Sequence, residues 1–500
     1  MSRETLLGID IGTSGCKAVL LASNGRILHE ATASYEPHYP QPGWAEMDPE
    51  TWYGAAIAAA RQVLSGATDA PEPAGIGISG QMISCTYLGE GGALRPSILW
   101  MDQRTTPIVD RLVQEFDEVL PPITMTPINT AYTLPRILWL REQQASLWSG
   151  LRGILWSKDY VRYRLTGICA TDPTDASGSL LLDSSRRRWS RRILEAFDLD
   201  EQLLPKLLDS HEVVGGLNAA GARDLGIPVG TPVVAGAGDL FSENLSAGNV
   251  HQNQRLIRFG SCGSVSSPVD RPVLDPQRKC PCYVHCLPGR WLAESSSQAF
   301  GLAEAWFKKA FYSIVASEDE ASAVHDLAEE EAASAPPGAE GLVFNPFIQG
   351  APYWDSALTG GFHGVALTHR RAHFMRAVIE GATYALADAA QMLTRMHGET
   401  TAAAAEALEW TAIGGGARSA TWCRIVAAVL GVELQVLEDA NPAKGAAMLA
   451  GIGTGVFSSF EEAIAVCVSP PTLVRPEAHA VNTYRALHRE YRRIHELYSQ

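Results

Sequence analysis

The sequence predicts an α/β protein built from two similar halves, and three observations lead to this fold class. A short hairpin pattern occurs near the start of the chain and returns about halfway along it. Short apolar runs that end in glycine-rich turns alternate with helical patterns in both halves. The 500 residues are 46% hydrophobic and 19% charged, a balance that suits large buried cores and excludes disordered, collagen-like and coiled-coil chains.

The first hairpin is predicted over residues 6–21, LLGIDIGTSGCKAVLL, where small residues separate two apolar runs. The same outline returns in LIRFGSCGSVSSPV, with Gly260 and Ser261 at its tip. Small residues allow backbone N–H groups and hydroxyls to approach a polyphosphate closely, although either tip alone would be an ordinary turn. Two tips at matching places predict a duplicated α/β unit that holds a nucleotide between its copies. The G-x-x-x-x-G-K-[ST] phosphate loop does not occur in the chain.

The other elements follow in chain order. Residues 74–80 and 232–239 read as buried strands of a parallel sheet. Helical patterns cover residues 51–66, 133–144 and 374–389, and the alanines and glycines on one stripe of the last predict a helix packed closely on a neighbour. The acidic stretch 314–340 is typical of an exposed helix and loop, residues 410–431 read as strand, glycine turn and helix, and we expect a domain boundary near 246–252.

Charge and cysteine content narrow the class of partner. The 55 acidic and 40 basic residues leave a formal net charge of −15, which repels nucleic-acid phosphates and anionic lipid. No apolar run approaches the length of a membrane-spanning helix, and the start MSRETLLGID lacks the pattern of a signal peptide. Nine thinly spread cysteines argue against a disulfide framework. We therefore expect a cytoplasmic protein that has neither nucleic acid nor membrane as a partner.

Two aspartates lie where chemistry is expected. Asp10 ends the first strand beside a hydroxyl-rich tip, where a carboxylate suits a Mg²⁺–phosphate complex, or caps the turn. Asp239 ends a predicted strand at the sheet edge where α/β proteins bind ligands. A carboxylate there accepts the proton of an attacking hydroxyl, or caps the helix that follows. The glycines of GGGARSATW (414–422) could cradle phosphate or the adenosine ribose, and a second element with Gly445 opens another closely packed helix, although such corners are often structural.

Three further features suggest functions that we do not favour. Cys280, Cys282, His285 and Cys286 could ligate a soft metal, but their spacing is not one of the common zinc spacings. The five arginines of SSRRRWSRRILEAF (184–197) fit a solvated face better than a nucleic-acid site. The aromatic stripes around Trp52 and Trp139 are typical of a core.

With these residues in view, the whole chain resembles the FGGY carbohydrate kinases. The landmarks occur in family order and end in the C-terminal signature GGFHGVALTHRRAHFMRAVIE (360–380). The others are GIDIGTSG (8–15), PGWAEMDPETW (42–52), GISGQM (77–82), ILWMDQRT (98–105), SKDYVRYRLTG (157–167), AGAGD (235–239), RFGSCG (258–263), IGGGARS (413–419) and KGAAMLAG (444–451).

The resemblance implies two actin-like (ribonuclease H-like) ATPase domains with a cleft between them, residues 1–248 binding sugar and carrying the base, and residues 249–500 binding ATP. It implies a kinase that uses ATP and Mg²⁺ on a sugar or polyol hydroxyl, and a homodimer is one expectation for its assembly. The implied roles are Asp239 as catalytic base and substrate ligand, Asp10 as metal ligand, Thr13, Ser14, Gly260 and Ser261 at phosphates, Gly415, Gly416 and Gly445 at adenosine, and Gln81, Met82, Ile83 and Trp100 around the sugar.

Within the family the chain is most similar to xylulokinases, which implies conversion of D-xylulose to D-xylulose 5-phosphate. It departs from them at Ile83, where His is common, and at residues 349–355, QGAPYWD, which resemble glycerol kinases. Arg136 stands where the family usually has Lys. A kinase for another sugar or polyol, of ribulose, glycerol or hexulose type, therefore stays open. A non-catalytic protein on the same ATPase fold is the alternative from a different class.

Overall fold

The computed structural model describes residues 4–67, 70–297, 299–312, 318–348, 350, 359–398 and 408–498. These residues form two compact units. Unit 1 comprises Met1–Val250, Val269–Leu292 and Ala440–Val468, and unit 2 comprises His251–Pro268, Ala293–Asp439 and Ser469–Gln500. The chain passes from unit 1 to unit 2 at residue 250, close to the expected boundary, and two later segments return to unit 1. The division into domains 1–248 and 249–500 stays a prediction.

A mixed sheet forms the centre of unit 1. Its order is β14-β15-β5-β1-β2-β3, and β16 also pairs with β5. Strands β1, β2 and β3 are antiparallel neighbours, whereas β5 runs parallel to β1, β15 and β16. This confirms the first hairpin and both strands predicted for the parallel sheet. The bounds are β1 Thr5–Ile11, β2 Gly15–Ala22, β3 Ile27–Ser34, β5 Pro73–Gly80, β14 Val213–Gly216, β15 Pro232–Val234 and β16 Ala237–Gly238.

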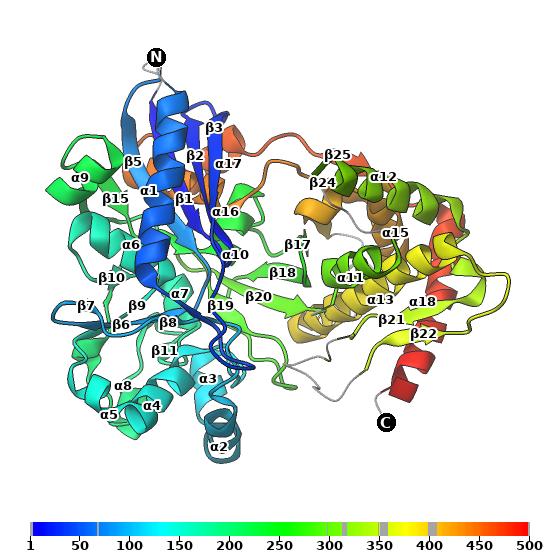
Figure 1. The fold of residues 1–500 in the computed structure, drawn as a ribbon, viewed down its shortest axis with the longest axis horizontal. Coiled ribbons are helices and arrows are strands. Elements are labelled where there is room, and N and C mark those ends of the chain that lie inside the picture. Colours follow the sequence, from blue (N-terminus) through cyan, green and yellow to red (C-terminus); the bar gives the residue numbers. More distant parts are fainter. Residues whose placement is uncertain are drawn as a thin grey trace. The chain divides into compact units, whose positions relative to one another are not determined.

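Helices cover both faces of this sheet. On one face α1 (Pro49–Gly66), predicted over 51–66, buries Trp52 and its alanines against the apolar side of β1 and β2. The Asp48 carboxylate accepts a hydrogen bond from the Glu50 amide and so caps the first turn of α1. On the other face α16 (Pro442–Gly453) packs so closely that a Cβ on Gly8 or Gly77 would overlap its backbone. Figure 1 shows this orange helix beside the blue strands, although the two are far apart in the sequence.

The remaining elements of unit 1 surround this sheet. The 133–144 prediction is confirmed by α4 (Thr133–Gln143), which is buried along most of its length. A smaller sheet has the order β4-β8-β6-β7, with β9 also paired to β6. The other bounds are β4 Glu46–Met47, β6 Cys85–Gly89, β7 Gly92–Ala93, β8 Ser97–Ile98, β9 Gly153–Trp156, β10 Ala170–Thr171, β11 Leu182–Asp183, β12 Arg188–Trp189, β13 Lys206–Leu207, β19 Cys282–Val284, α2 Thr106–Phe116, α3 Leu120–Thr124, α5 Ala145–Ser149, α6 Ser157–Thr166, α7 Pro173–Ser177, α8 Arg191–Ala196, η1 Glu201–Leu203, α9 Ala219–Leu225, α10 Asp239–Ser246 and α17 Phe460–Cys467.

The sheet of unit 2 contains strands in the order β20-β18-β17-β23-β24-β25. The second predicted hairpin is confirmed by β17 and β18, which are antiparallel, while β23 runs parallel to β17. The long helix α13 packs tightly, because a Cβ on Gly381 would overlap the Phe344 carbonyl group. Bounds are β17 Gln254–Phe259, β18 Gly263–Val269, β20 Trp291–Ser296, β21 Val343–Asn345, β22 Gly361–His363, β23 Glu409–Ile413, β24 Leu434–Val436, β25 Thr472–Val474, α11 Gly301–Phe311, α12 Glu318–Ser334, η2 Ala339–Gly341, α13 Arg371–His397, η3 Gly415–Arg418, α15 Ala420–Leu430 and α18 Ala478–Tyr498.

Two segments singled out in the sequence lie partly outside the described residues. The helix expected within 314–340 is α12, and residues 314–317 lie outside the described part of the chain. Residues 349 and 351–355 of the QGAPYWD segment lie outside it as well. In the ranges that the structure describes, no helix has the length and apolar content needed to cross a membrane.

Candidate active site

The carboxyl ends of three adjacent parallel strands of unit 1 bring the predicted substrate residues to one sheet edge. Ile11 of β1 and Gly238 of β16 are both in register with Gly80 of β5. The residues that follow these strands, among them Gln81 and Asp239, therefore emerge side by side. This is the edge at which open α/β sheets bind ligands.

The tip of the first hairpin is held from within unit 1. The Gly12 amide donates to the Gly15 carbonyl oxygen at 2.9 Å, so this N–H is engaged in the turn itself. The Tyr35 hydroxyl donates to the Gly12 carbonyl oxygen at 2.6 Å. Thr13 is half-buried, whereas Ser14 is exposed. A phosphate at this tip would therefore meet the two hydroxyls rather than the Gly12 amide.

Asp10 is half-buried at the end of β1, next to this tip. Burial raises the pKa of the nearby Cys16 thiol, and the negative charge of Asp10 raises it further. The same two causes act on the pKa of the Tyr35 hydroxyl. Asp10 therefore supplies negative charge beside the Thr13 hydroxyl, which is an oxygen donor set that suits Mg²⁺ with several retained waters.

A chain of polar contacts links the tip to the predicted sugar residues. The Trp100 indole N–H donates to the Thr13 hydroxyl at 3.1 Å, and the Gln81 amide donates to the Gly12 carbonyl oxygen at 3.2 Å. The Ser84 hydroxyl donates to Gln81 Oε1 at 3.2 Å and accepts from the Trp100 amide at 3.2 Å. Three predicted residues, Thr13, Gln81 and Trp100, thus belong to one network.

Ile83 has an unusual backbone conformation. Its φ angle is +68°, a left-handed value that β-branched residues rarely adopt. The Ile83 amide donates to Asp175 Oδ1 at 3.0 Å, and its carbonyl oxygen accepts from the Arg136 guanidinium at 2.7 Å. A Cβ on Gly178 would lie 3.3 Å from the Ile83 side chain, so that side chain packs over this glycine. Both peptide groups around the strained residue are therefore held by buried charged side chains.

Arg136 is fully buried and connects three segments of unit 1. In addition to Ile83, its guanidinium donates to the carbonyl oxygens of Trp100 at 2.9 Å and Thr130 at 3.0 Å. The sequence identified Arg136 only as a departure from the family pattern. Two of its nitrogens reach acceptors at separate points, whereas a lysine ammonium carries all three of its N–H donors on a single nitrogen.

A buried charge cluster lies beneath the same residues, and sequence reasoning missed it. The Lys158 ammonium lies 2.6 Å from Asp159, 2.9 Å from Asp172 and 3.6 Å from Asp175. Burial raises the pKa of Asp175 to about 8, although Lys158 opposes this shift. Perturbed buried carboxyls of this kind are typical of functional sites. The motif SKDYVRYRLTG contains Lys158 and Asp159, but nothing in its spacing indicated their partners.

The cluster also contacts the segment that carries Asp239. The Gly238 amide donates to the Thr174 hydroxyl at 2.9 Å, and a Cβ on Gly238 would lie within 3.0 Å of the Met82 sulfur. Helix α7, with Thr174 and Asp175, thereby holds the backbone at both Gly238 and Ile83.

Asp239 itself is half-buried and is the first residue of α10, whose N-cap is Gly238. Its Oδ1 accepts a hydrogen bond from the Leu240 amide at 2.8 Å. This contact to the first turn of α10 agrees in part with the expectation that Asp239 caps the helix.

The predicted nucleotide residues of unit 2 gather at the ends of its parallel strands. Arg258 of β17 is in register with Ile413 of β23, so the tip with Gly260 and Ser261 and the turn with Gly415 and Gly416 emerge at one edge. The carbonyl oxygens of Gly260 and Ser261 accept from amides at the start of α11. A Cβ on Gly415 would meet nothing within 4 Å, so space exists beside its backbone.

Gly445, unlike these four residues, belongs to unit 1, where it lies in α16. It is buried, and a Cβ there would overlap the Ser242 carbonyl oxygen of α10. This close helix contact is a structural reason for glycine at the position. Its implied contact with adenosine stays a prediction.

The cysteines and the histidine that were considered as ligands of a soft metal lie in a buried segment. Cys280, Cys282, His285 and Cys286 are all buried, and burial lowers the pKa of His285 to about 3. Within the described ranges, no three His, Cys, Asp or Glu side chains gather as a metal site. The core assignment of Trp52 and Trp139 is confirmed, since their exposed fractions are 0% and 8%.

The fold and the geometry of these sites describe a two-unit α/β protein, and comparison with known proteins names the family. Residues 5–246 match the N-terminal domain model, and residues 270–454 the C-terminal domain model, of the FGGY family of carbohydrate kinases. The chain belongs to this family, whose members use ATP as phosphoryl donor, and is a sugar kinase.

Three similar proteins indicate the range of substrates. The chain is 32% identical to a xylulose kinase of Bacillus subtilis over 98% of its own length and 96% of the relative's. It is 27% identical to a gluconokinase of Bacillus subtilis over 96% and 94% of the two chains. A ligand-bound xylulose kinase from Lactobacillus acidophilus superposes with a TM-score of 0.90, at 25% identity over 99% of this chain and 98% of that one. The family resemblance read from the sequence is confirmed.

Proposed function

We propose that this sugar kinase transfers the γ-phosphoryl group of ATP to a hydroxyl of D-xylulose, giving D-xylulose 5-phosphate and ADP. The observation that carries the proposal is the sheet edge of unit 1, where Asp10 lies at the end of β1 and Gln81 and Asp239 follow the adjacent strands β5 and β16. The similarity to xylulose kinases over nearly the whole chain supports the choice of sugar. A gluconate kinase is the second candidate, because a gluconokinase relative also matches along nearly the full length.

In this proposal Asp239 accepts the proton of the sugar hydroxyl as its oxygen attacks the γ-phosphorus and the bond to ADP breaks. The helix N-terminus favours the ionised carboxylate that this role requires. Gln81, Met82, Ile83 and Trp100 position the sugar, and the contacts of Arg136 and Asp175 hold the backbone of this segment.

The remaining proposed roles concern the nucleotide. Thr13, Ser14, Gly260 and Ser261 bind phosphates, and Gly415 and Gly416 bind adenosine. Mg²⁺ fits Asp10 and the neighbouring hydroxyls, because hard cations take carboxylate and hydroxyl oxygens. When bound there, it would neutralise charge on the transferred phosphoryl group. The homodimer and the cytoplasmic location stay predictions.

The test measures ATP consumption with D-xylulose, D-ribulose, glycerol, D-gluconate and hexuloses, using the wild type, Asp239→Asn and the surface control Asp110→Asn. The wild type should prefer D-xylulose, and Asp239→Asn should lower turnover at least about a hundredfold because the amide cannot accept the proton. The control should keep wild-type turnover. A preference for another sugar would overturn the substrate, and turnover above a tenth of wild type in Asp239→Asn would overturn the base.

A further inference from the structure

A cavity in unit 1, away from the residues of the candidate kinase site, has an unusual concentration of positive charge. Its volume is about 700 Å³, and five cationic side chains line it together with two carboxylates, Asp183 and Glu201. We call it the arginine pocket after its lining residues Arg186, Arg188, Arg191 and Arg192, which Lys206 joins. A local net charge of +3 on a chain of net charge −15 is the opposite of the average surface. The five cationic residues belong to SSRRRWSRRILEAF and to β13, and none of them has a proposed role in the kinase site.

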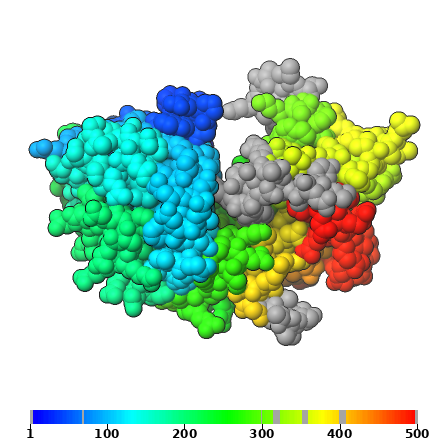
Figure 2. Space-filling view, turned by 90° about the horizontal axis from the view of Figure 1, so that it is seen from below, coloured from blue at the N-terminus to red at the C-terminus, as the bar shows by residue number. Residues whose placement is uncertain are grey.

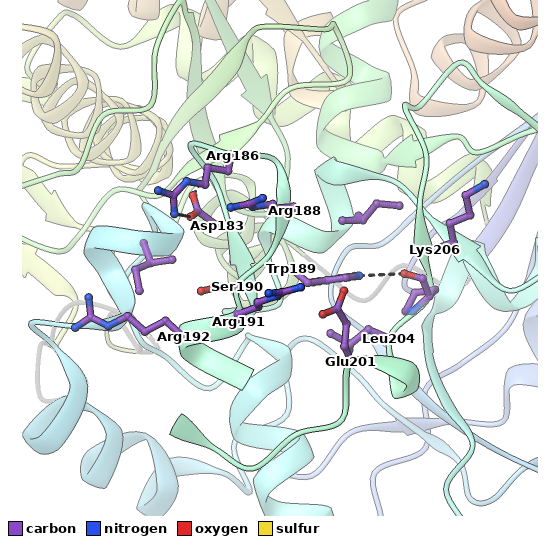
Figure 3. Close-up of a pocket in the computed structure, with 13 residues that line it drawn as sticks. Asp183, Arg186, Arg188, Trp189, Ser190, Arg191, Arg192, Glu201, Leu204 and Lys206 are labelled. Atoms are coloured by element: carbon purple, nitrogen blue, oxygen red, sulfur yellow. Dashed lines mark hydrogen bonds and ion pairs between the residues drawn. The ribbon is translucent and has the colours of Figure 1, made fainter. Parts of the chain in front are cut away.

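The local fold explains how these cations come together. The strands β11 and β12 form a hairpin that places Asp183 opposite Arg188, and α8 begins with Arg191 immediately after β12. The buried Trp189 anchors this corner, because its indole N–H donates to the Pro205 carbonyl oxygen at 3.1 Å. Figure 3 shows this bond as a dashed line from the Trp189 side chain. The backbone that carries the cations is thus held by a packed element.

Most of these cations lack a carboxylate partner. Arg186 lies 3.2 Å from Asp183, which neutralises that pair. Among the described residues Arg188, Arg191, Arg192 and Lys206 form no ion pair, and Figure 3 draws no contact from them to an acid. Like charges held near one another raise the free energy of the folded protein unless an anion lies between them. The side chains of Arg188, Arg191, Arg192 and Lys206 are exposed. Figure 2 shows part of the green-cyan region of the chain at the surface.

We propose that the arginine pocket binds a phosphorylated sugar or polyol. The planar guanidinium group matches the oxygens of phosphate. Several guanidinium groups that have no carboxylate partner favour a phosphorylated ligand over a neutral one. The Glu201 carboxylate would repel a second phosphate but accepts hydrogen bonds from hydroxyls, so the lining suits a ligand with one anionic end and a hydroxylated body. A volume of about 700 Å³ exceeds what inorganic phosphate needs and lies within the range of small-molecule sites.

A phosphorylated sugar or polyol is also the kind of product that a carbohydrate kinase releases. This connection is the only part of the proposal that rests on the family. Two sources are therefore distinguished by the test: the product of this enzyme and a phosphorylated sugar made by another kinase. Binding of a phosphorylated sugar from either source does not require Asp239, so the kinase site and the arginine pocket are tested separately.

The experiment is equilibrium dialysis of the full chain with labelled D-xylulose 5-phosphate and with 6-phosphogluconate. The variant is Arg188→Ala/Arg192→Ala, and the matched control is Arg61→Ala/Arg223→Ala, which removes two exposed arginines of unit 1 outside the pocket. The wild type and the control should bind two equivalents of at least one probe. The pocket variant should bind one, with the second site at least about tenfold weaker, because the loss of even one charged contact weakens binding by about that factor. Turnover at saturating ATP and sugar should be unchanged in all three proteins.

Competition identifies what the site recognises. Unphosphorylated sugar should leave the second site occupied, and inorganic phosphate should displace the probe only at much higher concentration. One equivalent bound in the wild type, equal binding in wild type and pocket variant, or displacement by inorganic phosphate at the probe's own concentration would overturn the proposal. The proposal would also be overturned if the pocket variant lost binding to an oligonucleotide that the wild type binds, while its binding of sugar phosphates stayed unchanged. Arg191→Glu repeats the comparison with a reversed charge.

Discussion

Replacing Arg136 with Lys should destabilise unit 1 even though Lys is the residue that the family pattern favours at this position. The Arg136 guanidinium donates to three carbonyl oxygens, those of Ile83 at 2.7 Å, Trp100 at 2.9 Å and Thr130 at 3.0 Å. Two of its nitrogens serve these acceptors, whereas an ammonium offers one nitrogen at one point. At least one buried carbonyl therefore loses a charged donor, which costs about 1.5–3 kcal/mol.

The assay is thermal unfolding together with steady-state kinetics. For a unit of this size, a loss of about 1.5–3 kcal/mol lowers the unfolding midpoint by roughly 2–5 °C. Because the lost contacts hold Ile83 and Trp100, KM for the sugar should rise while KM for ATP stays constant. Arg136→Met, which leaves all three carbonyls without this donor, should be the less stable of the two variants.

Arg141→Lys is the matched control, since Arg141 lies on the same helix, is half-exposed and donates to a single carbonyl oxygen, that of Phe197. Water replaces a donor at such a position, so the change should stay within about 0.5 kcal/mol. Equal midpoints for Arg136→Lys and Arg141→Lys, with an unchanged KM for the sugar, would refute the reasoning.

Three further predictions follow from single positions. Gly445→Ala should lower the unfolding midpoint of unit 1 strongly, because the added methyl group overlaps the Ser242 carbonyl oxygen; wild-type melting would show instead that α16 and α10 separate easily. The folded-state pKa of Asp175 is raised to about 8, so the stability of the wild type relative to Asp175→Asn should fall as pH rises from about 5 through 8, and parallel melting curves from pH 5 to 9 would contradict this. Ile83→His should lower KM for D-xylulose by up to about tenfold through one added hydrogen bond, and His tolerates φ of +68° better than Ile; unchanged KM for every sugar would remove Ile83 from the pocket.

Local patterns in the sequence sufficed for most elements and for the outline of the site. The hairpins, the helices α1, α4 and α13 and the strand ends at Asp10 and Asp239 all depend on apolar periodicity and turn residues, which neighbouring residues determine. The ordered motifs then indicated the family, which the comparisons confirmed. Individual roles such as that of Asp239 remain predictions.

The sequence by itself therefore determined the class of fold, the family and the strand ends where chemistry is expected. Only the tertiary structure revealed that Arg136 and Asp175 hold Ile83 in a strained conformation. It also revealed that Thr174 holds the backbone at Gly238, and that glycine at position 445 allows α16 to pack against α10. The Ile83 contacts join residues 53 and 92 positions apart in the chain. Such contacts depend on sheet register and helix packing, and a periodic pattern carries no record of which distant side chains a folded chain brings within hydrogen-bond distance.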